Sequence, residues 1–326
     1  MRYLNVVRLM LVMTLVVIIL GAYTRLADAG LGCPDWPGCY GQWLVPETPA
    51  EVENKDYLAQ RPLEVGKGWL EMIHRYFAGM LGLLIAGLAA WSWQRRFRQI
   101  PQQPVWLPTA LLGLVIVQAM LGMWTVTLLL KPVIVMMHLL GGFTLFALLF
   151  ILMLRLQSAH PSVADADRLR WAARIGLVLL VVQIALGGWT STNYAALACT
   201  DLPTCQGVWW PQMDFAEGFT LWRGIGTNYE YGVLDHPARV AIHMVHRLGA
   251  IVVSIWLAGL VYALVRHSQV LGTMGMRMGA LLILQVVLGL SNVLFHLPLW
   301  VATAHNATAA LLLLAVVQIN FTLRRT

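Results

Sequence analysis

The chain has 326 residues, of which 59% are apolar and 11% are charged, and its mean hydropathy is +0.70. A soluble domain carries about 25% charged residues, so this composition excludes an ordinary water-soluble protein. The formal net charge of +7 does not indicate a nucleic-acid-binding protein, because most arginines lie at the two ends and on alternate turns between apolar runs.

Apolar runs of about 20 residues recur along the chain, which is the length that a helix needs to cross a bilayer. Backbone polar groups in lipid must be hydrogen-bonded within the segment, so each run is predicted to be a helix. The eight predicted spans are 5–26, 69–94, 106–129, 132–156, 171–192, 239–265, 277–296 and 299–322. The sequence therefore predicts an all-α integral membrane protein embedded in the lipid bilayer.

The first run could instead be a secretory signal peptide, since Ala27-Asp28-Ala29 is similar to a cleavage site. A span is the favoured interpretation, because a run with the same features recurs in mid-chain, where no signal peptide can lie. The arginines that flank the runs are opposed there only by Asp165 and Asp167. This positive-inside pattern predicts a multi-pass protein of the bacterial cytoplasmic (inner) membrane with both termini in the cytoplasm.

All four cysteines lie in two long segments that this orientation places outside the membrane, 28–68 and 193–238. Cys33 and Cys39 form one pair, and Cys199 and Cys205 form another with the same spacing. Disulfides persist in such an oxidising space, so a disulfide in each loop is the favoured interpretation. Free thiols and metal ligands are the alternatives; neither loop segment has a histidine between its cysteines, which disfavours a metal.

The sequence also contains an internal repeat. The segment GAYT (21–24), followed by the first cysteine pair, matches GGWT (187–190), followed by the second; QAMLGMWTV (118–126) matches QVVLGLSNV (285–293). Each copy has four spans, so the two copies have the same orientation in the membrane. The predicted architecture is two parallel-repeat four-helix bundles: an N-terminal half over 1–156, a cytoplasmic linker over 157–170 and a C-terminal half over 171–326.

The repeat pairs four histidines inside the predicted spans, His74 with His246 and His138 with His305. Each lies a turn or two inside the outer end of its span. The two in each half therefore share one depth, as two axial ligands of one haem iron do. A single histidine hydrogen-bonded to a backbone carbonyl is the plainer alternative. Symmetric pairs at matched depth favour haem, since polar residues in a span usually mark function.

The two halves differ beside the first histidine of each pair. Glu71 precedes His74 by three residues and lies on the same helix face, whereas its counterpart in the second half is His243. A carboxylate at this place can move protons, so the first half is predicted to be the reaction site. Arg75 and Arg247 follow the histidines and are candidate contacts of haem propionates, with snorkelling to the interface as the alternative.

At these residues the chain resembles the haem A synthase family over essentially its whole length. The resemblance is carried by TRLADAGLGCPDWPGC, EMIHRYFAG, LGMWTV, GGWTSTN and VHRLGA, together with His138, His305 and the second cysteine pair. It implies an oxidoreductase of eight spans. It also implies that the enzyme oxidises the C8 methyl of haem O to a formyl group, which makes haem A for cytochrome oxidase.

The resemblance also implies roles for the paired residues. His246 and His305 would bind a resident haem b as cofactor, and His74 and His138 would bind the substrate, haem O. Glu71 would be the catalytic carboxylate, and Cys33 and Cys39 would form the outer-loop disulfide. The implied partners are haem O synthase (protohaem farnesyltransferase) and cytochrome oxidase assembly factors.

Two other functions use the same features. A di-haem b-type electron-transfer protein would need the histidine pairs but not Glu71, and it would place its haems at two depths rather than one. A transporter built from two repeats would bind no haem, and no predicted span shows the Gly/Pro-broken pattern that transporter sites often use.

Overall fold

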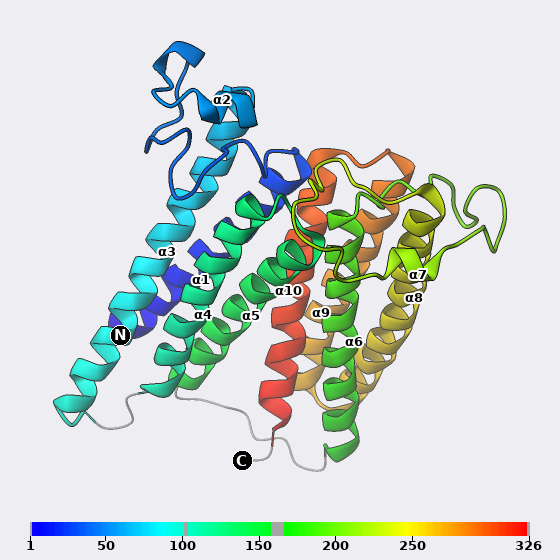
Figure 1. Ribbon diagram of the computed structural model, residues 1–326. Coiled ribbons are helices and arrows are strands. Elements are labelled where there is room, and N and C mark those ends of the chain that lie inside the picture. Colours follow the sequence, from blue (N-terminus) through cyan, green and yellow to red (C-terminus); the bar gives the residue numbers. More distant parts are fainter. Residues whose placement is uncertain (1, 101–103, 158–165, 325–326) are drawn as a thin grey trace. The chain divides into compact units, whose positions relative to one another are not determined.

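The computed structural model describes residues 2–100, 104–157 and 166–324, and these residues are almost entirely helical. Within this part of the chain there is no strand, only two isolated bridges in the cysteine loops. Eight long helices have the length and apolarity to cross a membrane: α1 Arg2–Leu26, α3 Val65–Phe97, α4 Trp106–Thr127, α5 Pro132–Leu156, α6 Asp167–Thr192, α8 His236–His267, α9 Gln269–Leu294 and α10 Leu299–Leu323 (Figure 1). The predicted all-α membrane fold with eight spans is confirmed.

Three short helices lie in the long loops: η1 Pro49–Glu51, α2 Asp56–Gln60 and α7 Phe215–Gly218. Most of the predicted linker 157–170 falls outside the described residues, because 158–165 are not described. Its last residues are helical, since α6 begins at Asp167 rather than at 171. Proline or a capping side chain marks the start of several long helices, including Pro132 of α5, Pro237 of α8 and Ser268 before α9, whose hydroxyl accepts from the Leu271 amide.

Unusual backbone conformations recur at matching places in the two halves. Left-handed φ angles occur at Leu129 and Leu130 (51° and 59°) before α5 and at His296 and Leu297 (57° and 62°) before α10. Tyr40 and Gln206, directly after the second cysteine of each loop, have φ of 54° and 58°. The two stretches therefore share local backbone geometry even where their residues differ.

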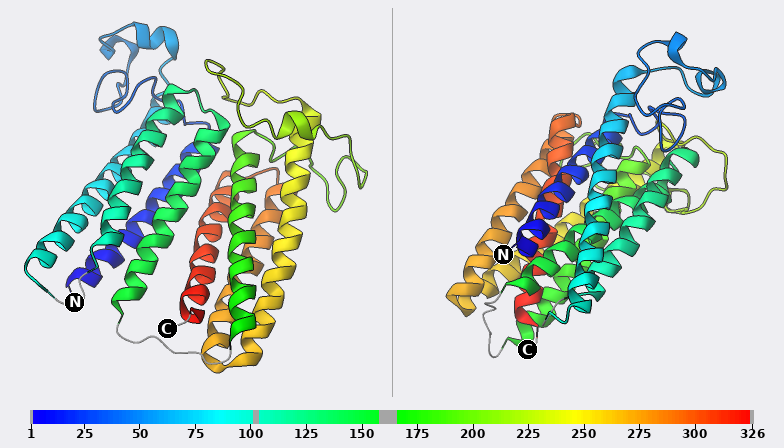
Figure 2. Two further views of the ribbon diagram at one scale, coloured as in Figure 1. Left: turned by 60° about the horizontal axis from the view of Figure 1, so that its bottom comes forward. Right: turned by 90° about the vertical axis from the view of Figure 1, so that its left-hand side faces the viewer.

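By backbone contacts the chain divides into two compact units, and each is described by itself. The first comprises Met1–Met153 together with Trp222–Tyr231, a stretch that we call the clasp segment. In this unit α3 packs against both α1 and α4. The second comprises Leu154–Leu221 and Gly232–Thr326. Its four long helices form a closed ring, in which α6 packs on α8, α8 on α9, α9 on α10 and α10 on α6 (Figure 2).

The clasp segment is held on the first unit by contacts of several kinds. The Tyr229 amide donates to the Leu129 carbonyl (3.0 Å), and the Tyr229 ring is buried in a cluster with Leu31, Val126 and Leu130. The ammonium group of Lys131, a side chain that is only 2% exposed, lies 3.2 Å from the centre of the Trp222 ring. It also donates to the Gly224 carbonyl. These contacts join the turn between α4 and α5 to a loop that begins in the other half of the sequence.

A buried ion pair completes this attachment. Arg61 makes a bidentate pair with Glu230 of the clasp segment, and the two side chains are 14% and 6% exposed. Removing one partner leaves the other charge buried without compensation, which costs about 3–5 kcal/mol. We expect Arg61→Ala to lower the free energy of unfolding by about 3 kcal/mol in an SDS titration of the solubilised protein.

The matched control is Glu64→Ala, which removes the other carboxylate bonded to Arg61. Glu64 is 43% exposed, so its loss is expected to cost less than about 1 kcal/mol. Equal losses for the two variants would show that the clasp segment contributes nothing through its ion pair.

Candidate functional site

His74 on α3 and His138 on α5 face each other inside the first unit. Their ring centroids are 6.4 Å apart and their planes are at 86°. Two imidazoles that share one metal ion through ring nitrogens have centroids about 6 Å apart, because each metal–nitrogen bond is about 2 Å long. The separation of this pair therefore fits one iron between the two rings.

His246 on α8 and His305 on α10 occupy the corresponding places in the second unit, where Gln183 of α6 and Gln285 of α9 bond to them. A glycine of a neighbouring helix lies against each of the four rings. A Cβ at these glycines would lie 2.8–3.4 Å from the Cε1 atom of the ring; the pairs are Gly21 with His74, Gly122 with His138, Gly187 with His246 and Gly289 with His305. Larger side chains at these places would displace the imidazoles.

The histidine pairs fit haem better than a bare metal ion. Among the described residues no group of three or more His, Cys, Asp or Glu side chains could hold a metal ion, so each pair supplies two protein ligands at most. A porphyrin supplies the remaining ligands itself. The Nδ1 atoms of His74, His138 and His305 are also buried without a hydrogen-bond partner in the described chain. Such orphaned polar atoms are rare in a finished site, so these three imidazoles are not fully satisfied by the described protein groups.

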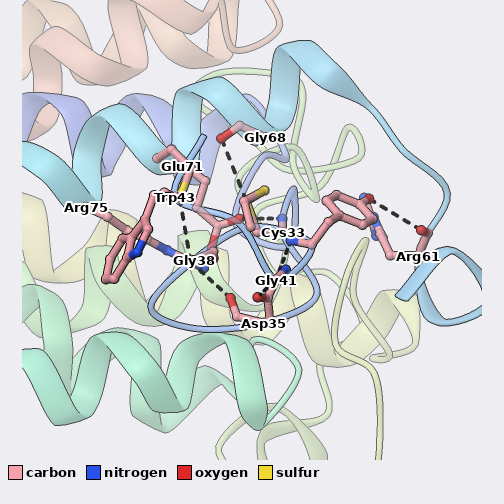
Figure 3. The surroundings of a disulfide bond; sticks show 12 residues. Cys33, Asp35, Gly38, Gly41, Trp43, Arg61, Gly68, Glu71 and Arg75 are labelled. Carbon is pink, nitrogen blue, oxygen red and sulfur yellow. Dashed lines mark hydrogen bonds and ion pairs between the residues drawn. A yellow bond between two sulfur atoms is a disulfide. The ribbon is translucent and has the colours of Figure 1, made fainter. Parts of the chain in front are cut away.

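Glu71 is 5% exposed and lies one turn before His74 on α3. One carboxylate oxygen accepts from the Cys33 backbone amide (2.9 Å), and the other accepts from the Arg75 guanidinium (Figure 3). The carboxylate is thus fixed between the first outer loop and the helix that carries His74. A fixed, buried carboxylate beside a substrate can hold a proton or stabilise positive charge.

Arg75 is engaged by the first outer loop in the structure. Besides Glu71 it donates to the backbone carbonyls of Asp35 (3.0 Å), Pro37 (3.2 Å) and Gly38. Asp35 in turn accepts from the amides of Tyr40 and Gly41, which close the turn after the disulfide. The structure thus gives Arg75 a part in holding the loop over Glu71, and its contact with a haem propionate stays a prediction.

The second half repeats this arrangement without the carboxylate. His243 takes the place of Glu71: it is 4% exposed, its Nδ1 pairs with the Ala195 carbonyl (2.9 Å), and its Nε2 accepts from Arg247 (3.0 Å). Arg247 also donates to loop carbonyls at 3.0 Å, those of Cys199, Asp201 and Thr204. Its propionate contact likewise stays a prediction. The difference between Glu71 and His243 predicted from the sequence therefore falls at equivalent, buried places.

Both cysteine pairs form disulfides. Cys33–Cys39 and Cys199–Cys205 have Cα–Cα distances of 4.8 and 4.9 Å, and all four residues are fully buried. In the second loop Asp201 accepts from Thr204 and from the amides of Gln206 and Gly207. These hydrogen bonds lower the pKa of Asp201 to about 2, so the turn keeps its anionic anchor in any mildly acidic medium.

Three glutamines beside the histidines are absent from the sequence-based prediction. Gln183 and Gln285 bond to His246 and His305, and Gln118 packs against Gly141 one turn after His138. The signal that could have found them is their polarity, because an amide inside an apolar span is costly unless it is hydrogen-bonded.

The sequence matches the family model described as cytochrome oxidase assembly protein over residues 5–317. A heme A synthase of Shewanella oneidensis is 49% identical over 317 residues, which cover 96% of this chain and 94% of the relative. Heme A synthases of Rhizorhabdus wittichii and Caulobacter vibrioides are 27% and 26% identical, each over 96% of this chain and over 91% and 93% of the relative. The range matched by the family model contains both histidine pairs and both disulfide loops.

Proposed function

This chain belongs to the family of cytochrome oxidase assembly proteins, its function is haem A synthesis, and we propose that it oxidises the C8 methyl of haem O to a formyl group. The observation that supports this reaction is the buried Glu71 carboxylate, one turn from a histidine pair whose separation fits an iron. The di-haem electron-transfer alternative is not supported, since the full-length relatives are named heme A synthase.

The first unit is proposed to bind the substrate. His74 and His138 hold the iron of haem O from its two faces, and Gly21 and Gly122 give their rings room on the neighbouring helices. The farnesyl chain of haem O is long and apolar, so a site among membrane-spanning helices suits its entry and exit.

Glu71 is proposed as the catalytic carboxylate. Oxidation of a methyl carbon attached to the macrocycle leaves positive charge on that carbon, and an adjacent carboxylate stabilises it. The same carboxylate can take the proton of an attacking water. Two such oxidations, each adding one water oxygen and passing two electrons to an external electron acceptor, give a gem-diol, which loses water to form the aldehyde. The Cys33 amide and Arg75 hold Glu71 in place for both roles.

The second unit is proposed to bind haem b through His246 and His305. When bound, a bis-histidine haem supplies one-electron transfer. The residues of this half hold the ring nitrogens and the loop: Gln183 and Gln285 bond to the imidazoles, and Arg247 ties the second disulfide loop to α8.

The location proposed for the chain follows from the same features. Its eight spanning helices fit a multi-pass protein of the bacterial inner membrane. The arginine distribution supports cytoplasmic termini, with both disulfide loops on the outer side. Haem O synthase and cytochrome oxidase assembly factors are the proposed partners, because the substrate must come from one and the product pass to the other.

The experiment that tests this function is acid-acetone extraction of haem from the purified protein, co-expressed with a source of haem O. We expect haem B together with haem O or haem A on reversed-phase chromatography. Haem B alone would favour the di-haem carrier. Purified protein without haem would indicate that the four histidines only pack between helices, and the transporter would become the leading alternative.

A further inference from the structure

The two histidine pairs differ in the contacts of one imidazole ring in each pair, His246 in the second half and His74 in the first. Gln183 Nε2 lies 3.0 Å from His246 Nδ1 and donates to the His246 backbone carbonyl at 2.9 Å. The sequence offset between Gly21 and Gly187 also relates Val17 to Gln183. Val17 is therefore the counterpart of Gln183 in the first half. The Val17 side chain offers no hydrogen bond, although its backbone carbonyl lies near His74, and His74 Nδ1 is buried without a side-chain hydrogen-bond partner in the described chain. A side-chain amide therefore supports the imidazole of one half alone.

A second substitution accompanies the first. Gly249 leaves the space that the Gln183 amide fills, because a Cβ there would lie 2.3 Å from Gln183 Oε1. At the spacing that relates His74 to His246, the counterpart of Gly249 is Phe77. The second half thus carries both the amide and the room for it, whereas the first half carries two apolar side chains.

The remaining ligand positions carry a glutamine in both halves. Gln285 Nε2 lies 3.2 Å from His305 Nε2, and Gln118 occupies the matching place in the first half, where its Nε2 has no hydrogen-bond partner among the described residues. The exchange of a glutamine for an apolar residue therefore concerns only the neighbours of His246 and His74.

The hydrogen-bonding capacity of Gln183 matches a metal-binding imidazole. A histidine that binds metal through Nε2 carries its proton on Nδ1 and usually donates it to a nearby acceptor, which fixes the ring and raises its basicity. Gln183 Oε1 is buried and has no hydrogen-bond partner in the described chain. A half-turn of the amide would present this oxygen to the Nδ1 proton, at the cost of the hydrogen bond that the amide nitrogen donates to the His246 carbonyl.

We propose that Gln183 is a positioning residue that holds His246 as an axial ligand of a permanently bound haem, and that its replacement by Val17 in the first half leaves His74 free to exchange haem. This inference rests on the proposed function. A cofactor must stay through many turnovers, whereas a substrate haem must enter and its product must leave. Loss of such a supporting hydrogen bond typically costs about 10–100-fold in metal affinity.

The test compares full-length solubilised proteins for the rate at which they lose haem b to excess apomyoglobin. We expect Gln183→Met, which removes the amide at similar volume, to speed this loss about 10–100-fold and to shift the electron paramagnetic resonance g values of the second-half haem. Gln183→Glu keeps an acceptor for Nδ1–H, so it should retain haem b and lower its midpoint potential. An unchanged release rate and unchanged g values in the methionine variant would overturn the proposal, as would equal release from both variants.

The reciprocal variant transplants the pair into the first half. Val17→Gln combined with Phe77→Gly should slow the release of haem O, and no slowing would overturn the assignment for His74. Measurements on the wild-type protein distinguish a failure of the proposed function from a failure of the proposal for Gln183. Wild-type protein without haem b would refute the proposed function as well, whereas a haem A-forming enzyme indifferent to Gln183→Met would refute this inference alone.

Discussion

Glu71→Gln is expected to retain haem b and to lose haem A formation, with the rate falling about 100-fold or more, the typical contribution of a general acid or base. The amide oxygen of glutamine can still accept from the Cys33 amide, so the loop should stay folded. The variant loses the proton-accepting charge and the ion pair with Arg75. The measurement is the ratio of haem A to haem O extracted from cells that supply haem O.

The second half offers the matched control for this experiment. His243→Gln changes the buried residue at the equivalent place, which also contacts the following arginine and the outer loop. It should leave most haem A formation intact, because the proposed substrate binds in the other half. A normal haem A level in Glu71→Gln would assign the catalytic role to another residue.

His246→Ala is expected to remove the resident haem b. Loss of a mere hydrogen-bonding partner of a metal ligand costs about 10–100-fold in affinity, so loss of the ligand itself should lower the haem b retained through purification by more than about tenfold. The pyridine haemochrome spectrum measures this content. His267→Ala, an exposed histidine at the end of the same helix α8, is the control and should retain haem b fully.

The spanning helices could be predicted because the bilayer leaves the chain few alternatives. Predicted and observed bounds agree best where apolar residues fill the helix, as in α5 (132–156 in both). They differ where a helix continues through charged residues. The span predicted over 69–94 lies within α3, whose ends carry Lys67 and Arg96. The span predicted over 277–296 begins eight residues after the start of α9. The first turns of α9, before Arg277, contain glycines and have weaker hydropathy, so the prediction left them out.

The residues of the site were predictable where the repeat and the cost of polarity in a span coincide. The histidine pairs and Glu71 are polar, lie within apolar runs, and are related by the repeat. The loop partners of Arg75 and Arg247 were not predictable, because they are backbone carbonyls 37–48 residues away in loops without periodicity. Gln183 was not predicted from the sequence. Its difference from Val17 indicates a role only when the structure shows which imidazole each residue lies beside.

The clasp segment has a consequence for biosynthesis. The ribosome delivers Lys131 and Arg61 well before Trp222–Tyr231, with all of α6 and most of the second outer loop in between. At a typical synthesis speed of about 5–20 residues per second, the interval is on the order of ten seconds. During this interval the buried cation, the arginine and the Leu31–Val126–Leu130 cluster lack their partners. An N-terminal fragment that stops after α5 would remain in that state, so the first unit matures only through the chain that follows it.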